Sequence, residues 1–193
     1  MALLSGLGPP RRKARGVLAV ALASLLHAGS PGSGRAGESL QMMEQKIKAG
    51  LLYNFLKYTE WPRATAASAV AVCVFGDDPF RGSLEPMAER TVNRRPITLR
   101  HVREVPRTEG CHLVFVNAAE RDRWPELAAF LAGKSVLTVS DFPEFVSAGG
   151  MIELGQKGDR IDVKVNMAAL ASAGLQVQER LLRLAHVVDA GGP

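Results

Sequence analysis

The sequence predicts a single-domain α/β sandwich, in which helices flank a mostly parallel sheet that carries an antiparallel hairpin at one edge. Three observations support this class. The short runs AVAVCVF (69–75) and CHLVFVN (111–117) are almost entirely apolar, as in strands buried on both faces. Helical patterns separate such runs through the first two thirds of the chain, which is typical of parallel sheets. A length of 193 residues suits one well-filled core.

The first 28 residues have the three-part layout of a secretory signal peptide. A basic run from Arg11 to Arg15 precedes the apolar block GVLAVALASLL (16–26), and small residues follow. The block is well short of the ~20 residues that a membrane-spanning helix needs. We expect cleavage after Ala28, or as late as Ala36, then a Gly/Ser/Pro linker over 29–39 and the folded domain over 40–190.

The basic character of the chain belongs largely to this leader. The formal net charge is +5, and residues 1–28 contribute four basic side chains and no acidic one. The exported chain therefore keeps a charge near +1. A nucleic-acid partner needs a strongly basic surface, so we do not expect one.

The first helix is predicted from about Leu40 to Thr59, and Pro62 stops the chain from continuing it. Its core stripe is expected to consist of residues at helical spacing, namely Ile47, Leu51, Phe55 and Tyr58, widened by Leu52. Lys48 falls off that stripe.

Two aromatic residues near the end of this helix are candidates for a partner contact. Tyr53 falls off the predicted core stripe, and Trp61 follows the end of the helix. Exposed aromatic side chains mark interaction sites when they are not part of a core.

The central elements are predicted from apolar runs and from the capping, proline and glycine residues that bound them. A helix over 79–90 is expected after the first strand, with Asp77 or Asp78 as its N-cap and Pro79 at its first position. Further strands are expected over 95–102, 111–117 and 135–141, and a helix over 124–133 that ends at Gly133.

The C-terminal third predicts a short helix, a hairpin and closing helices. The short helix covers 143–148, and MIEL and RIDVKVN (160–166) form strands joined by a turn at GQKGD. Glu153 and Asp162 lie on these facing strands and are expected to be exposed edge charges. Helices over MAALASAG and LQVQERLLRLAHVV, interrupted at Gly174, are expected to close the domain.

No pattern of a catalytic or metal site is present, so neither an enzyme nor a cofactor is predicted. His101, His112 and His186 lie far apart and lack the spacing of metal ligands. The chain has no nucleophile elbow and no glycine-rich phosphate loop after a strand.

The segment VSDFPEFVSAGGM is the candidate ligand edge. Ser140 and Asp141 end a predicted strand, and open α/β sheets bind ligands at that end of their strands. Gly149 and Gly150 allow the backbone to approach a ligand or a neighbouring strand closely. The alternative is a tight turn in which Asp141 caps a helix.

The two cysteines, Cys73 and Cys111, allow one intramolecular pairing in an exported chain. Such a bond closes a loop of roughly 38 residues and is worth ~4 kcal/mol in the chain-entropy model. The alternative is two buried free thiols.

Taken together, these segments resemble the YfiR-like family of small periplasmic proteins. The resemblance rests on KAGLLYNFLKYTEWP, VCVFGDDPF, CHLVFV, VLTVSDFPEFVSAGGMIEL, RIDVKVN and AGLQVQERLLRLAHVV, which follow in family order from about Lys46 to Val188. It implies a compact exported α/β sandwich. Cys73 and Cys111 occupy the positions of one family cysteine pair, whereas a second pair, found in some members near GGM, is absent.

The resemblance also implies a function. The best-understood members bind the periplasmic sensing domain of an inner-membrane diguanylate cyclase and inhibit it, which lowers cyclic di-GMP and biofilm or exopolysaccharide output. An OmpA-like outer-membrane lipoprotein can sequester the repressor, and the redox state of its cysteines is thought to tune it. The resemblance further suggests a homodimer. The alternative is a periplasmic ligand-binding or sensing module without a cyclase partner, with its pocket at Asp141 and Gly149.

Overall fold

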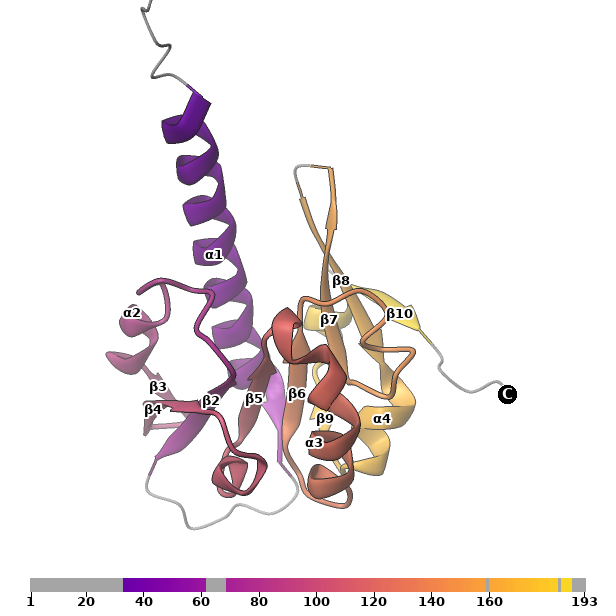
Figure 1. The fold of residues 1–193 in the computed structure, drawn as a ribbon. Helices are drawn as coiled ribbons and strands as arrows, with labels where there is room; N and C mark the ends of the chain where they lie inside the picture. Colours follow the sequence, from indigo (N-terminus) through magenta and orange to yellow (C-terminus); the bar gives the residue numbers. More distant parts are fainter. Residues whose placement is uncertain (1–32, 62–68, 159, 184, 189–193) are drawn as a thin grey trace, which may run out of the picture.

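The computed structural model describes residues 33–61, 69–158, 160–183 and 185–188. An eight-stranded sheet forms the centre, in the order β10-β8-β7-β6-β5-β2-β4-β3 (Figure 1). Its strands are β2 (Val70–Phe75), β3 (Thr91–Val92), β4 (Arg95–Val102), β5 (Leu113–Val116), β6 (Leu137–Ser140), β7 (Ile152–Lys157), β8 (Arg160–Asn166) and β10 (His186–Val188).

The sheet is mostly parallel, as the sequence predicts. Strands β4, β2, β5, β6 and β7 are parallel to their neighbours in that order. Strands β7 and β8 form the predicted antiparallel hairpin, and β10 pairs in parallel with the outer side of β8. The α/β sandwich is confirmed, although β10 rather than the hairpin makes the outermost edge.

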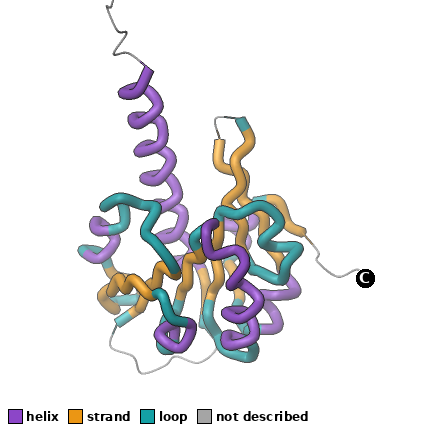
Figure 2. Tube along the Cα trace, viewed as in Figure 1, coloured by secondary structure: helices purple, strands orange, loops and turns teal. Residues whose placement is uncertain are grey.

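Five α-helices and two short 3₁₀ helices accompany the sheet in the described part of the chain. The α-helices are α1 (Ser33–Tyr58), α2 (Glu85–Ala88), α3 (Trp124–Leu131), α4 (Met167–Ser172) and α5 (Glu179–Leu182), and the 3₁₀ helices are η1 (Val105–Thr108) and η2 (Ala118–Arg123). A two-stranded sheet of β1 (Thr59–Glu60) and β9 (Gln176–Val177) joins the end of α1 to the C-terminal region. Helix α1 and the β7–β8 hairpin extend past the body on the same side (Figure 2).

Alternate residues of the central strands belong to two separate core clusters, one on each face of the sheet. In β2, Val72 and Val74 belong to a cluster that includes buried residues of α1, α2, α4 and α5. Cys73 and Phe75 belong to the cluster that includes the buried residues of α3. Successive side chains of a strand point to opposite faces, so helices cover both faces of the sheet.

Helix α1 differs from its prediction at its start and on its buried face. It begins at Ser33, so residues 33–39, expected in a linker, are helical. The predicted leader, residues 1–28, lies outside the described residues. Leu52 and Phe55 are fully buried as expected, but Ile47 is 48% exposed and Lys48 is only 5% exposed. Among the described residues, no helix is both long and apolar enough to cross a membrane.

The prediction of a helix over 79–90 is wrong for most of its length. Only the single turn of α2 forms, and Asp78 Oδ1 accepts a hydrogen bond from the Phe80 backbone N–H at 2.8 Å. Phe80 is fully buried and stacks edge-on against Phe115. Because Phe80 is buried in the core, the chain around it does not continue as the predicted helix, and α2 begins only at Glu85.

Two helices predicted in the C-terminal third do not form as predicted. Residues 143–148 form turns, and LQVQERLLRLAHVV divides into β9, α5 and β10. Strand β9 pairs with β1 and β10 pairs with β8, so backbone pairing outweighs the helical pattern of this segment. The other predicted strands, α3 and α4 are confirmed, and Gly133 follows α3 with φ +72°.

Candidate functional site

The polar residues at the end of β6 bind one another and the following loop. Ser140 is fully buried, and its hydroxyl donates to the Val116 carbonyl at 2.7 Å. The same oxygen accepts a hydrogen bond from the Phe142 backbone N–H at 3.2 Å. Ser140 therefore fixes the loop that leaves the sheet.

Asp141 is joined to helix α1 by the buried Lys48. The Lys48 Nζ lies 2.8 Å from Asp141 Oδ2 and 2.7 Å from Glu44 Oε1. Burial alone would lower the pKa of Lys48, but the hydrogen bonds and negative charges of the two carboxylates outweigh it and leave that pKa raised. Asp141 is not the cap of a helix, since turns follow it.

The loop over 142–150 closes over the sheet with its own aromatic residues. Phe145 is buried between the rings of Trp124 and Phe142, and the Trp124 Nε1–H donates to the Ala148 carbonyl at 2.9 Å. A Cβ added at Gly150 would clash with the Phe145 ring. The close approach at Gly150 is therefore to Phe145.

Glu153 is a buried ion-pair partner rather than an exposed edge charge. It is 2% exposed, and its Oε1 lies 2.8 Å from Lys164 Nζ. Its Oε2 accepts a hydrogen bond from the Val146 backbone N–H, and Asn166 Nδ2–H donates to the Val146 carbonyl. The hydrogen bond to Glu153 raises the pKa of Lys164. Asp162 is 2.7 Å from His186 Nδ1.

Ser140, Asp141, Gly149 and Gly150 thus lie at one end of the sheet, but they mainly support the loop there. Among their described side-chain atoms, Asp141 Oδ1 is buried without a hydrogen-bond partner. Gly149, with φ +89°, is exposed and has open space beside it. Ligand binding at this edge stays a prediction.

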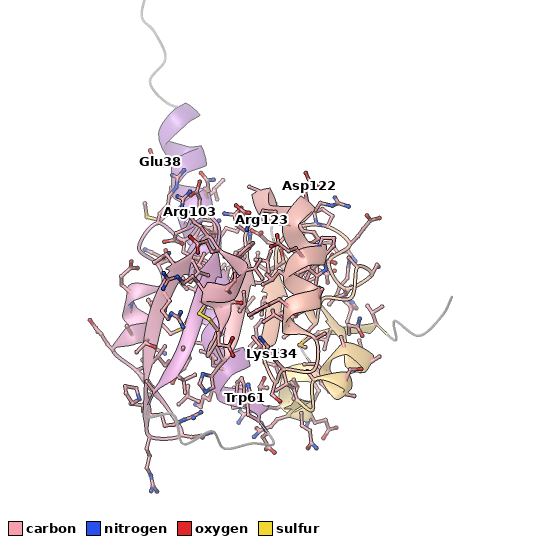
Figure 3. All side chains as sticks on the ribbon, turned by 60° about the horizontal axis from the view of Figure 1, so that its bottom comes forward. Glu38, Trp61, Arg103, Asp122, Arg123 and Lys134 are labelled. Atoms are coloured by element: carbon pink, nitrogen blue, oxygen red, sulfur yellow. A yellow bond between two sulfur atoms is a disulfide. The ribbon has the colours of Figure 1, made fainter. Side chains whose placement is uncertain are left out.

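The disulfide between Cys73 and Cys111 is present (Figure 3). It links β2 to the residue two positions before β5, with a Cα–Cα distance of 6.0 Å and a sequence separation of 38. Both cysteines are buried in the cluster on the α3 side of the sheet. The bond therefore crosslinks β2 to the segment that leads into the adjacent strand β5.

The two candidate contact residues are half-buried and have different surroundings. Tyr53 lies on α1, and the Arg90 guanidinium is 4.8 Å from the centroid of its ring. Trp61 lies beyond β1, far from Glu38 at the other end of the helix (Figure 3). The Trp61 Nε1 is buried and has no hydrogen-bond partner within the described residues. Their role as a partner contact stays a prediction.

His112 connects Trp61 to the sheet. Its Nδ1 accepts a hydrogen bond from the Ala71 backbone N–H at 3.2 Å, and its ring stands edge-on to Trp61 with centroids 6.0 Å apart. Burial, followed by the positive charge of Arg95, lowers the pKa of His112. The neutral ring is the form that accepts this bond.

Sequence patterns missed the Lys48–Asp141 pair because its two residues are distant in the chain. Lys48 and Asp141 are 93 positions apart. One local signal was available: Lys48 shares a helical face with Leu52 and Phe55, at i+4 and i+7. A lysine on an apolar face indicates a buried partner.

The fold and its crosslink define a class of protein: a small disulfide-containing α/β sandwich. No group of three or more metal-ligating side chains occurs among the residues that the structure describes. The chain belongs to the YfiR/HmsC-like family, whose model matches residues 45–186.

A solved structure supports the fold alone. The chain is similar to the ABC domain in complex with L-Trp from Streptococcus pneumonia, with a TM-score of 0.51 and 9% sequence identity. The match covers 75% of this chain and 60% of that one, so this chain spans less than two thirds of its length.

Proposed function

We propose that this protein is an exported periplasmic regulator that binds the periplasmic sensing domain of an inner-membrane diguanylate cyclase and inhibits it. The observation that carries the proposal is the family match over residues 45–186, since proteins of this family are periplasmic regulators rather than enzymes. The Cys73–Cys111 disulfide supports export, because such bonds persist in oxidising compartments.

The proposed mechanism is a population shift in the cyclase. A regulator that binds only the inactive conformation of the sensing domain lowers the population of the active one. Moving such an equilibrium from 1:99 to 99:1 requires about 5.5 kcal/mol of differential binding. Catalysis by the regulator itself is not needed. Tyr53 and Trp61 are the proposed contact residues.

Deletion of the gene tests this function in the cell. We expect cyclic di-GMP and biofilm output to rise in the deletion strain and to return to normal when the gene is restored. Unchanged cyclic di-GMP, with the partner cyclase expressed, would contradict the proposal.

Pull-down from cells in which the gene is restored would identify the proposed cyclase and the proposed OmpA-like lipoprotein. Sedimentation of the purified protein would test the proposed homodimer.

The second candidate, a ligand-sensing module at the Asp141–Gly149 edge, has less support. Ser140 uses its hydroxyl within the fold, and Asp141 is paired with Lys48. A direct ligand titration with Asp141→Asn as the variant would test that edge.

A further inference from the structure

A cleft separates the middle of α1 from the segment 80–90, which carries α2. Its main hollow has a volume of about 370 Å³, within the range of small-molecule sites. A smaller hollow of about 150 Å³ adjoins it, and Met42 and Arg81 line both. Neither hollow is lined by residues of the β6 edge or by Trp61. The cleft is therefore separate from the sites discussed above, apart from Tyr53.

Part of the lining of the main hollow is apolar and adaptable. Met42, Tyr53, Pro86 and Met87 line it together with Ala49. Met42 is 54% exposed, although methionine side chains are ordinarily well buried. Methionine side chains repack readily around hydrocarbon, and exposed ones are common at binding surfaces.

The lining of the main hollow also carries cationic side chains and no carboxylate. Lys46, Arg81 and Arg90 line it, and no Asp or Glu does. In the described part of the chain, none of the three forms a salt bridge, and the Arg90 guanidinium lies over the Tyr53 ring. Three unpaired cations beside an apolar wall favour an anion that also carries a hydrocarbon body.

A residue that lines the smaller hollow carries an unsatisfied hydrogen-bond acceptor. Gln45 lines it and is 7% exposed, and its Oε1 is buried without a hydrogen-bond partner among the described residues. A buried acceptor of this kind costs free energy until a donor reaches it. Glu38 lines the same hollow, so a second anion is disfavoured there.

We infer that this cleft binds a small amphipathic organic carboxylate that carries a hydroxyl or amide N–H donor. The carboxylate lies between Lys46, Arg81 and Arg90, and the hydrocarbon body lies against Tyr53 and the two methionines. The donor reaches Gln45 in the adjoining hollow. The inference goes beyond the proposed inhibition of a cyclase and does not depend on it.

A titration with three related probes tests the chemistry of the site. The probes are 3-hydroxyoctanoate, octanoate, which lacks the donor, and 3-hydroxyoctanamide, which lacks the charge. They are added to the oxidised protein and followed by ¹⁵N NMR. We expect saturable shifts of the Gly50 and Gly82 amides, which line the cleft, but not of Gly149 or Gly155. The first probe should bind about tenfold more tightly than either of the others, as loss of one charged or buried hydrogen bond predicts.

Matched variants separate the site from nonspecific attraction. Arg81→Gln and Arg90→Gln should each weaken 3-hydroxyoctanoate about tenfold. Arg107→Gln removes an exposed arginine outside the cleft and should leave affinity unchanged. Gln45→Leu should abolish the preference for 3-hydroxyoctanoate over octanoate.

Three results would overturn the inference: no saturable shift at Gly50 and Gly82, equal binding of the acid and the amide, or equal loss in Arg107→Gln. If the probes fail but Arg81→Gln and Arg90→Gln abolish inhibition of the cyclase, the cleft binds an acidic segment of the partner instead. That outcome rejects the small-molecule site while the proposed regulatory function stands.

Discussion

At the residue scale, the polar interior is organised around two lysine–carboxylate pairs. Lys48 joins α1 to Asp141 at the end of β6, and Lys164 joins β8 to Glu153 of β7. Buried charges are tolerated when each has a partner and further hydrogen bonds. These pairs fix how α1 and the 142–150 loop lie on the sheet.

Removal of the Lys48 charge should therefore destabilise the fold. Lys48→Met leaves two carboxylates without their shared cation, and we expect a loss of ~2–4 kcal/mol in the free energy of unfolding. Urea unfolding measures it. Lys46→Met changes an exposed lysine of the same helix and should stay within ~0.5 kcal/mol of the unchanged protein. Equal losses in the two variants would contradict the account.

The lowered pKa of His112 predicts acid-sensitive stability. Because the folded state disfavours the proton, the contribution of His112 is fully present above its unfolded pKa of about 6.5. It is lost as the pH falls through the lowered pKa of the folded protein.

His112→Asn tests this contribution, because the amide oxygen still accepts from Ala71 but does not titrate. The variant should lose part of the fall in unfolding free energy between neutral and mildly acidic pH. His101→Asn, which changes an exposed histidine on β4, should keep the full dependence. Identical pH profiles for both variants would show that His112 contributes nothing.

At the element scale, the loop over 142–150 depends on close contact between its glycine and aromatic residues. The Phe145 ring occupies the space where a side chain at Gly150 would lie. Tight packing of this kind leaves little room for backbone adjustment.

Gly150→Ala should consequently cost ~1–3 kcal/mol of stability through overpacking. Gly155→Ala is the matched control, since its nearest new contact, at 3.6 Å, is ordinary van der Waals distance. Thermal unfolding of both variants measures the difference. A Gly150→Ala variant as stable as Gly155→Ala would mean that the loop packs differently.

The strands could be predicted from the sequence where their apolar or alternating residues are bounded by turn residues. The central strands and the β7–β8 hairpin are of this kind, because an apolar run between turn residues has few alternatives. The 79–90 and 175–188 segments are different: burial of Phe80 and backbone pairing of β9 and β10 override their local helical patterns.

The candidate sites were predictable to a smaller extent. The cysteine pairing could be predicted because two cysteines allow only one intramolecular pairing. The Lys48–Asp141 contact joins segments 93 positions apart, and the local pattern around Lys48 indicates a buried partner without identifying it. The cationic cleft likewise arises from residues of α1 and of the 80–90 segment, which only the tertiary fold brings together.

At the scale of the whole molecule, the disulfide stabilises the central strands against unfolding. It closes a loop with a sequence separation of 38, and its removal should cost up to ~4 kcal/mol. Urea unfolding of the oxidised and the dithiothreitol-reduced protein measures this difference. The double variant Cys73→Ala/Cys111→Ala should not respond to the reductant. Equal stability of the oxidised and reduced protein would contradict a stabilising role.

The central claim concerns control of a second protein, and reconstitution tests it most directly. The proposed partner, a diguanylate cyclase identified by pull-down, is placed in lipid nanodiscs, where both faces are accessible, and its synthesis of cyclic di-GMP is followed as oxidised regulator is added. The account predicts a saturable fall in the rate, weakened by Tyr53→Ala or Trp61→Ala. A rate that stays constant over the whole titration, with the cyclase active, would contradict it.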